Sequence, residues 1–310
     1  MTNEITAMMI DEAGVGAAVL DRVSADGAAI VPLASAWSTT PELLREAAAA
    51  SPFSFAARLL GVEPLLVERQ PIRPIDGGRS FASTRVDTPL HTDSQMVLGM
   101  SATLQILICV KPAARGGESV LVDGAQLLTR LEREDPAFAS VLFDVDRVQR
   151  FYFGDVAGPT VALRGGHLAW TCAPAAGAAA HGDDRIAVAL AHALASERPI
   201  VHALRPGDAL VASNHRMLHG RRPFEGDREL VRLLVWLERP LAADPRHVAR
   251  AREVSPPPDW TTLARVRAVL AILRGVPPAK VASDSRVAEA TLYAWREAFM
   301  RGGVPALAIA

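Results

Sequence analysis

The middle of the chain consists of short apolar runs, rich in β-branched residues, that glycine and proline interrupt at frequent intervals. Runs of roughly four to eight such residues between Gly and Pro are typical of β-strands. The runs occupy 65–70, 103–110, 119–122, 148–153, 160–163, 167–171, 200–204, 209–213 and 229–237. Many short strands with a few helices outside them predict a mainly β fold with flanking helices, a double-sheet barrel or jelly roll.

Four segments outside these runs have the pattern of helices. The first of them has Thr40 in the N-cap position and Pro41 at the first helical position, where each residue type is favoured. A second opens in the same way with the pair Asp135-Pro136. The predicted helices are 41–50, 123–134, 136–142 and 183–197.

The composition changes after about residue 250. Ser255-Pro-Pro-Pro258 is typical of a linker, and the two segments 261–274 and 287–301 beyond it have helical patterns. The chain is therefore predicted to divide into a main domain over 1–250, a linker over 251–260 and a small all-helical module over 261–310.

Length, charge and cysteine content exclude few functions. The chain has 310 residues, half of them hydrophobic, which is enough for one large catalytic domain. The formal net charge of -1 gives no strong field toward nucleic acid or a membrane. The two cysteines, Cys109 and Cys172, lie in apolar runs and are expected to be buried free thiols.

The chain has no stretch of about 18 apolar residues, so we expect no membrane span. The segment 1–14 is acidic and lacks the basic start of a signal peptide. We expect a cytoplasmic protein, and a homo-oligomer is compatible with the sequence.

A candidate metal site begins with His91 and Asp93. Residues i and i+2 of an extended segment point the same way, so these two can offer an imidazole and a carboxylate to one ion. A His-x-Asp pair is common by chance and leaves the assignment open. His219, which ends a strand-like run before Gly220, adds a second imidazole. Two histidines and one carboxylate on one face of an ion suit Fe(II) in oxygenases, because other positions stay open.

Four motifs in a fixed order make this pattern specific. They are L-H-T-D at 90–93, G-G-E-S at 116–119, N-x-x-x-L-H-G-R at 214–221 and R-x-x-x-R at 228–232. In these motifs the chain resembles the taurine dioxygenase/TfdA-type family of Fe(II)/2-oxoglutarate oxygenases, close to the clavaminate synthase-like group. The resemblance implies a double-stranded β-helix (jelly roll) with Fe(II) as cofactor and 2-oxoglutarate as co-substrate.

The reaction that the resemblance implies is a dioxygenase reaction on a small molecule. O2 and 2-oxoglutarate are consumed, succinate and CO2 are formed, and an unactivated C–H bond is hydroxylated or otherwise oxidised. An amino acid or a biosynthetic intermediate is the expected class of substrate. Asp93 is present where halogenating members of this fold have Ala or Gly, so hydroxylation is favoured over halogenation.

The resemblance also implies roles at the matching positions. His91, Asp93 and His219 would be the iron ligands. Arg232 would pair with the distal carboxylate of 2-oxoglutarate, which a planar guanidinium can bind through two hydrogen bonds. The hydroxyl of Ser119 would add a hydrogen bond to the same carboxylate.

Four further positions have less definite assignments. Arg228, the first arginine of R-x-x-x-R, either lines the co-substrate site or pairs with a surface acid. Gln95 and Arg221, next to the metal motifs, are candidates for substrate contact. Asn214 is expected to hydrogen-bond to backbone near the distal histidine, which is a structural role.

The C-terminal segment carries a second resemblance. R-G-V-P at 274–277, A-K-V-A at 279–282 and V-A-E-A-T-L-Y-A-W at 287–295 resemble the helix-turn-helix of transposase-type DNA-binding proteins. In such motifs the second helix enters the major groove.

Charge argues against DNA as the partner of this segment. Residues 255–310 carry seven basic and four acidic side chains, whereas DNA binding relies on clustered Lys and Arg. Asp284, Glu289 and Glu297 lie among the residues that would approach the duplex. We favour a module that packs on the barrel, covers the site or makes a dimer. The alternatives are a DNA-binding regulator that senses 2-oxoglutarate or iron and, least favoured, a nucleic-acid oxygenase.

Overall fold

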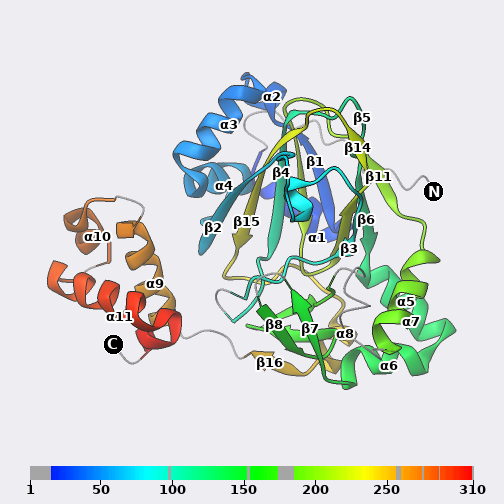
Figure 1. The fold of residues 1–310 in the computed structure, drawn as a ribbon. Helices are drawn as coiled ribbons and strands as arrows, with labels where there is room; N and C mark the ends of the chain where they lie inside the picture. The colour runs from blue at the N-terminus through cyan, green and yellow to red at the C-terminus, as the bar shows by residue number, and fades with distance from the viewer. Residues whose placement is uncertain are drawn as a thin grey trace.

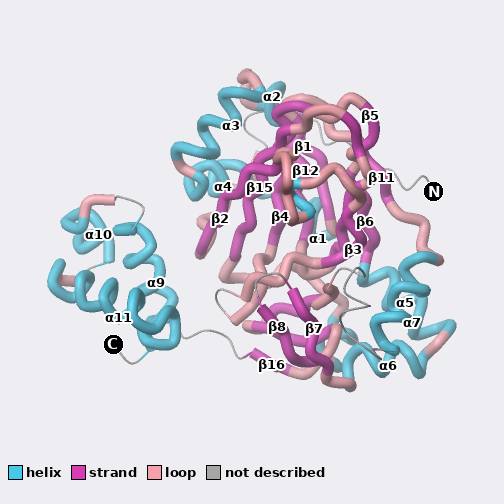
Figure 2. Tube along the Cα trace, viewed as in Figure 1, coloured by secondary structure: helices cyan, strands magenta, loops and turns pink. Residues whose placement is uncertain are grey.

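Two antiparallel sheets form the main body of the protein (Figures 1 and 2). The computed structural model describes residues 15–96, 99–151, 154–173, 185–255, 260–273, 276–285 and 287–308. The larger sheet has the order β1 (Ala28–Pro32), β12 (Asp208–Ser213), β4 (Leu104–Lys111), β15 (Glu229–Trp236) and β2 (Leu66–Ile72). The smaller sheet has the order β11 (Ile200–His202), β6 (Ser119–Asp123), β13 (Met217–Arg221) and β3 (Thr88–His91).

Apolar side chains of both sheets meet between them. Leu210 and Leu230 of the larger sheet belong to the same buried cluster as Leu121 and Met217 of the smaller sheet. The predicted jelly roll is confirmed in this double-sheet interior, which also surrounds the site described below.

Helices cover the outer face of the larger sheet. Strand residues alternate between two faces, and Val231, Leu233 and Val235 of β15 pack in one buried cluster with these helices. The helices are α1 (Ala17–Asp26), α2 (Leu33–Ala36), α3 (Pro41–Ala50) and α4 (Pro52–Leu60). The alternate residues of β15, among them Arg232, therefore face the interior of the barrel.

The four predicted helices are present. The predicted helix 41–50 is α3, and the Thr40 hydroxyl accepts a hydrogen bond from Leu43 N at 3.3 Å. The Asp135 carboxylate accepts one from Phe138 N at 3.0 Å, where α6 begins. The helices α5 (Gly124–Glu134), α6 (Pro136–Asp144) and α7 (Arg185–Ala195) share a buried cluster that reaches the smaller sheet.

Short elements complete the main body. β5 (Arg115–Gly116) pairs with β14 (Phe224–Glu225), β7 (Arg147–Phe151) pairs with β8 (Gly154–Gly158), and β9 (Val161–Arg164) lies between β10 (His167–Trp170) and β16 (Glu253–Ser255). The 3-10 helix η1 (Phe81–Ser83) precedes β3, and α8 (Pro245–Arg250) precedes β16. Strand β16 occupies part of the predicted linker 251–260, so the boundary at residue 250 stays a prediction.

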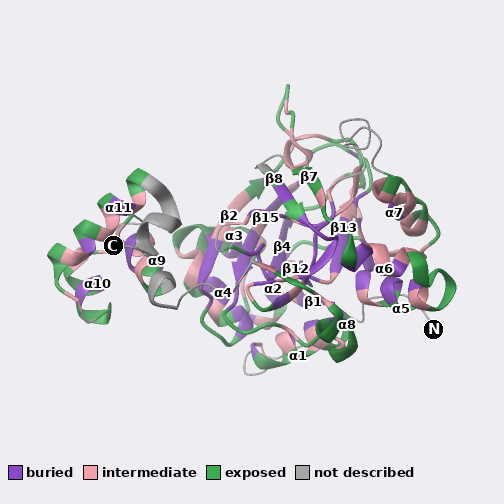
Figure 3. Cartoon of the chain, turned by 90° about the horizontal axis from the view of Figure 1, so that it is seen from below, coloured by how far each residue is buried: buried purple, intermediate pink, exposed green. Residues whose placement is uncertain are grey.

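The C-terminal segment is all-helical, as predicted. It consists of α9 (Trp260–Leu273), α10 (Pro278–Ser285) and α11 (Glu289–Ala308), which we call the C-terminal module. Ala268, Val281, Ala282 and Leu292 form a small core of its own. In the main body the strands are largely buried, whereas the helices around them show exposed faces (Figure 3).

Two further sequence predictions can be compared with the structure. Cys109 and Cys172 are buried and free, as expected. Among the described residues, no helix combines the length and the apolar character that crossing a bilayer requires.

Candidate metal centre

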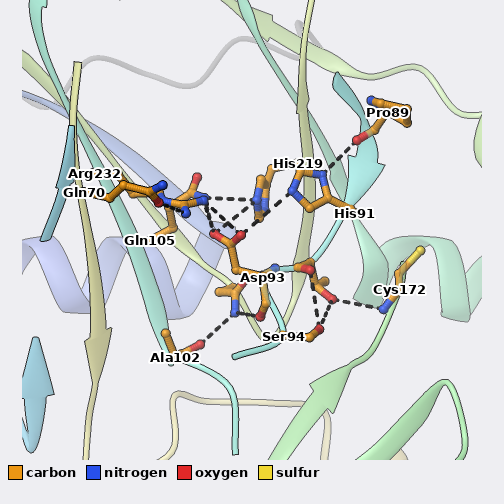
Figure 4. Close-up of polar contacts among 12 residues, drawn as sticks. Gln70, Pro89, His91, Asp93, Ser94, Ala102, Gln105, Cys172, His219 and Arg232 are labelled. Atoms are coloured by element: carbon orange, nitrogen blue, oxygen red, sulfur yellow. Dashed lines mark hydrogen bonds and ion pairs between the residues drawn. The ribbon is translucent and has the colours of Figure 1, made fainter. Parts of the chain in front are cut away.

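Strand pairing brings the two predicted histidines together. His219 on β13 is the Cα partner of His91 at the end of β3, and the two rings have centroids 4.5 Å apart. Asp93 follows His91 by two residues. Its Oδ1 lies 3.9 Å from His91 Nε2, and its Oδ2 lies 3.7 Å from His219 Nε2. The three side chains point toward one another in Figure 4.

The donor atoms of these three residues fit a ferrous ion. One atom from each lies within 4.8 Å of the other two. Within the part of the chain that the structure describes, no other group of three His, Cys, Asp or Glu side chains has this geometry. Two imidazole nitrogens and one carboxylate on one side of an ion leave positions open for co-substrate and O2.

Hydrogen bonding and burial prepare the two imidazoles for a metal. His91 Nδ1 lies 2.9 Å from the carbonyl oxygen of Pro89, which can only accept, so Nδ1 carries the proton and Nε2 keeps its lone pair. Burial, together with the neighbouring His91, lowers the pKa of His219 to about 3. The His219 ring can therefore offer a neutral nitrogen near neutral pH.

Asp93 is held in its ionised form. Burial alone would raise its pKa, but the charge of Arg232 and the nearby His219 outweigh burial and hold the pKa well below its usual range. Arg232 Nη1 donates to both carboxylate oxygens at 3.0 Å. A carboxylate that stays ionised is available as a metal ligand over the whole physiological pH range.

Gln105 of β4 bridges two of the three side chains. Its Nε2 donates to Asp93 Oδ2 at 2.7 Å and lies 3.0 Å from His219 Nε2. Gln105 is not among the site residues predicted from the sequence. The signal was the one polar side chain among the residues of β4 that precede Lys111, at a position that alternation directs into the barrel.

Asn214 fixes the backbone of the carboxylate ligand. Its Oδ1 accepts from Asp93 N at 2.8 Å, while its Nδ2 donates to Asp93 O at 2.8 Å and to Ala102 O at 2.9 Å. The expected structural role is therefore present, but on the loop of Asp93 rather than beside His219. Asn214 is fully buried, so these bonds replace its contacts with water.

Arg232, predicted to bind 2-oxoglutarate, faces Asp93. Besides its two bonds to that carboxylate, its Nη2 donates to Gln70 Oε1 on the neighbouring strand β2. Its buried Nε has no hydrogen-bond partner among the described residues. The role predicted for Arg232 stays a prediction, and two of its three nitrogens already have protein partners.

A cavity beside the triad extends from His91 and His219 to Arg228 and Ser119. The Arg228 guanidinium is buried, and its Nη2 donates to the carbonyl of Gly117 at 3.2 Å. Burial, followed by the charge of Arg221, lowers the pKa of Arg228 to about 10. No carboxylate pairs with Arg228 in the described part of the chain. Of its two predicted alternatives, the structure therefore favours the one that lines the site.

The two candidate substrate residues have different surroundings. Arg221 lines the cavity, and its guanidinium donates to the carbonyls of Phe81, Thr84 and Val86, so it fixes the segment before β3. Gln95 is buried, and its Oε1 has no hydrogen-bond partner among the described residues. Substrate contact stays a prediction for both.

Comparison with known proteins identifies the domain that holds this site. Residues 63–158 and 181–234 match the model of the taurine catabolism dioxygenase TauD, TfdA family. The matched ranges contain the whole triad and Arg228. This part of the chain is a TauD/TfdA-family domain. The predicted enzyme class is confirmed: the protein is an Fe(II)/2-oxoglutarate-dependent dioxygenase, with Fe(II) as cofactor and 2-oxoglutarate as co-substrate.

The C-terminal module of this dioxygenase also matches a family model. Residues 259–308 match a homeodomain-like domain, which confirms the predicted helix-turn-helix resemblance. A search of curated proteins gave no match.

Solved structures resemble the dioxygenase at the level of the fold. Asparagine oxygenase (AsnO) is 17% identical, with a TM-score of 0.50 over 70% of this chain and 76% of that chain. A taurine dioxygenase from Burkholderia xenovorans is 16% identical, with a TM-score of 0.47 over 75% of this chain and 84% of that chain. The PvcB protein from Pseudomonas aeruginosa is 18% identical, with a TM-score of 0.47 over 70% and 77%.

Proposed function

We propose that this dioxygenase holds Fe(II) with His91, Asp93 and His219 and hydroxylates an unactivated C–H bond of a free amino acid. The convergence of three donor atoms within 4.8 Å beside a cavity is the observation that carries the proposal. Bound iron, with 2-oxoglutarate and O2, supplies the oxidant. The side chains around it orient the substrate and limit the access of water.

We place the distal carboxylate of 2-oxoglutarate on Arg228 and Ser119, in place of the predicted Arg232. Arg228 is a buried cation without a carboxylate partner among the described residues, in the same cavity as the triad. Ser119 is buried in that cavity too, so its hydroxyl can join the same carboxylate. A buried guanidinium without a partner is costly, and an anionic ligand would remove that cost. Arg232 is less suited because Asp93 and Gln70 already use its two terminal nitrogens.

Groups of both charges next to the triad support an amino acid as substrate. On β2, Gln70 is the Cα partner of Arg232 and Glu68 is that of Leu234, so alternation puts Glu68 and Gln70 on one face. Burial, with a smaller contribution from the charge of Asp93, raises the pKa of Glu68 above its ordinary value, although the charge of Arg232 and a hydrogen bond with Gln95 oppose the shift. A carboxylate and a guanidinium thus lie close together at this end of the site.

Two unpartnered atoms add to this picture. Arg232 Nε is a donor and Gln95 Oε1 is an acceptor, and both are buried without partners in the described structure. The donor suits a substrate carboxylate, and the acceptor with Glu68 suits an ammonium group. This pair of complementary positions favours a zwitterion over a simple anion.

A substrate screen tests the proposal. The protein with Fe(II), 2-oxoglutarate and O2 is incubated with each common amino acid, and both succinate and the mass gain of one oxygen atom are measured. We expect coupled product from at least one of them. His219→Ala should lose at least about a hundredfold in turnover, the upper loss seen when only an outer partner of a metal ligand is removed.

His192→Ala is the matched control, because His192 lies near the end of α7 and is exposed. It should keep wild-type turnover. Equal turnover in Asp93→Ala and wild type would contradict the ligand assignment. Oxygenated product only from acids that lack an amine would contradict the substrate class.

A further inference from the structure

We propose that the C-terminal module, despite its helix-turn-helix form, serves as a fixed wall of the dioxygenase: it closes one end of the barrel interior and holds the loop that follows Asp93, instead of binding DNA. Only the turnover readout in its test rests on the proposed function. The proposal stands on the contact between the module and the barrel, on the short path from that contact to the metal centre, and on the charges of the module.

The module packs on the barrel through buried apolar side chains. Leu66, Leu234 and Trp236 of the larger sheet share one buried cluster with Val266 and Val269 of α9. Ala298, Trp295 and Phe299 of α11 and Leu270 of α9 complete it. Arg267 adds an ion pair with Glu63, with Nη2 and Oε2 3.5 Å apart. Figures 1 and 3 both place the module beside β2, at the edge of the larger sheet.

This contact continues the face that carries the metal centre. Arg232, Leu234 and Trp236 alternate along β15 and therefore point to one side. Their Cα partners on β2 are Gln70, Glu68 and Leu66. Arg232 and Gln70 belong to the hydrogen bonds around Asp93, whereas Trp236 and Leu66 touch the module. Four residues of a strand span about 14 Å, so the contact with the module lies about that far along β15 from Arg232.

A second connection runs through the loop that returns from Asp93 to β4. Trp236 Nε1 donates to the carbonyl of Met100 at 3.0 Å, and the Met100 side chain is buried in the cluster shared with the module. Two residues further on, Asn214 joins the carbonyl of Ala102 to the backbone of Asp93. The module therefore covers the residues that fix the return of this loop, and its removal would expose Trp236 and Met100 to water.

The same packing occupies part of the helix that would read DNA. The second helix of a helix-turn-helix is the one that reads the groove, and here that helix, α11, places Trp295, Ala298 and Phe299 in the contact with the barrel. The exposed start of α11 carries Glu289.

Four of the five described cations of the module have partners in this chain. Lys280 pairs with Asp284 at 3.2 Å and Arg296 pairs with Glu297 at 2.8 Å, while Arg265 lies over the Trp295 ring. Phosphate binding needs cations that are free to replace counterions, and mutually neutralised pairs supply few of them.

Cross-linking measures whether the module is docked. In Glu63→Cys/Arg267→Cys, a short bis-maleimide should join the main body to the module within one chain. The native thiols will react slowly, because burial raises the pKa of both Cys109 and Cys172 to about 12. Glu63→Cys alone is the control. Absence of the intramolecular product in the double variant overturns the proposal.

An interface variant measures what docking does for the metal centre. Val269 is fully buried in the contact, so Val269→Asp places an uncompensated carboxylate there. We expect the cross-link yield, the affinity for Fe(II) in anaerobic titration and the turnover each to fall by about tenfold, the change that 1.4 kcal/mol produces. Met300→Asp, on α11 but 66% exposed, makes the same change in charge and should match wild type.

The outcomes separate this proposal from the proposed function. If the cross-link is lost in Val269→Asp and the Fe(II) affinity is unchanged, the module is no wall of the site and the proposal is wrong. If no amino acid is oxidised, the proposed function fails while the cross-link and the Fe(II) titration still decide here. A salt-sensitive mobility shift of duplex DNA by the full-length wild-type chain also overturns the proposal.

Discussion

The metal centre and the C-terminal module both carry a motif of a known family, yet they use their polar groups in different ways. At the metal centre, Arg232 Nε and Gln95 Oε1 are buried and have no hydrogen-bond partner among the described residues. Arg228 lines the cavity beside the triad, and no carboxylate of the described residues pairs with it. In the module, Lys280 and Arg296 are neutralised by acids on the same helix. Unused hydrogen-bonding capacity beside a cavity indicates a ligand, whereas exposed ion pairs indicate a surface in contact with solvent.

The comparison shows that a motif can predict the shape of a segment without predicting the partner that the segment binds. The helix-turn-helix match describes three helices that the structure contains. Trp295, Ala298 and Phe299 of the helix that would read DNA pack on the barrel. Four of the five described cations of the module have partners in this chain. The region that matches the TauD/TfdA model, in contrast, contains three side chains whose donor atoms converge on one point. It also contains Arg228, a buried cation that has no carboxylate partner among the described residues. Substitutions in both regions test this difference.

The largest effect is expected from Arg228, which has no carboxylate partner among the described residues. Arg228→Ala should raise the KM for 2-oxoglutarate by about a hundredfold, because two charge-assisted hydrogen bonds to the distal carboxylate are lost. Arg232→Ala should act mainly on the KM of the amino acid. Steady-state kinetics on both variants decides between them, with exposed Arg222→Ala as control. A large change in the 2-oxoglutarate KM for Arg232→Ala alone would restore the original prediction.

The next largest effect is expected on stability, from the residue that holds the backbone of Asp93. Asn214→Ala removes three hydrogen bonds and leaves the buried N–H of Asp93 and the carbonyl of Ala102 without a partner. The free energy of unfolding of the metal-free protein should fall by about 2 kcal/mol in urea denaturation. Thr129→Ala removes one exposed side-chain bond and should change it by less than about 0.5 kcal/mol. Equal stability of the two variants would contradict the role given to Asn214.

Acid should destabilise the metal-free protein through its buried imidazoles. Burial lowers the pKa of both His215 and His219 from 6.5 to about 3. Between those values the unfolded chain binds a proton at each ring and the folded chain does not, so stability falls as the pH falls from about 6.5 toward 3. The slope is at most about 1.4 kcal/mol per pH unit for each histidine.

Urea denaturation between pH 7 and pH 5 measures this slope. His219→Gln should reduce it, because one of the two imidazoles that resist protonation is gone. A wild-type stability that rises on acidification over this range would show that these rings are protonated in the folded state.

The smallest effect is expected on the surface of the module. Lys280→Ala breaks an exposed pair with Asp284 and should change the free energy of unfolding by less than about 0.5 kcal/mol. It should leave turnover and cross-linking unchanged. A strong loss of either would mean that this charge has a partner which the pairing within α10 does not reveal.

The site was predictable where a ligand type and a spacing coincide. His91 and Asp93 alternate on an extended segment, and His219 follows in a motif with Gly220 and Arg221, so the three could be named from the order of the motifs. Gln105 could not be named, because its role depends on the pairing of β4 with β12 and β15 inside the barrel. The prediction that Arg232 binds the distal carboxylate of 2-oxoglutarate stays untested, and the two arginines are told apart here only by their neighbours in the folded chain.

The fold was predictable where local signals are strong. Caps at Thr40 and Asp135 marked helices that the structure contains. The helix α1 and the strand β1 carry no such signal, since residues 17–32 are alanine-rich and their apolar positions become meaningful only when Val19 and Val23 pack on the larger sheet. Strand β16 carries no strong local signal, because its pairing partner β9 lies about ninety residues earlier in the chain.

Diffraction at the iron absorption edge from crystals grown without oxygen, with Fe(II) and 2-oxoglutarate, tests the account most directly. We predict one anomalous peak bonded to His91 Nε2, His219 Nε2 and the Asp93 carboxylate, with the distal carboxylate of 2-oxoglutarate on Arg228. A peak at any other group of side chains, or 2-oxoglutarate bound away from that cavity, would contradict it.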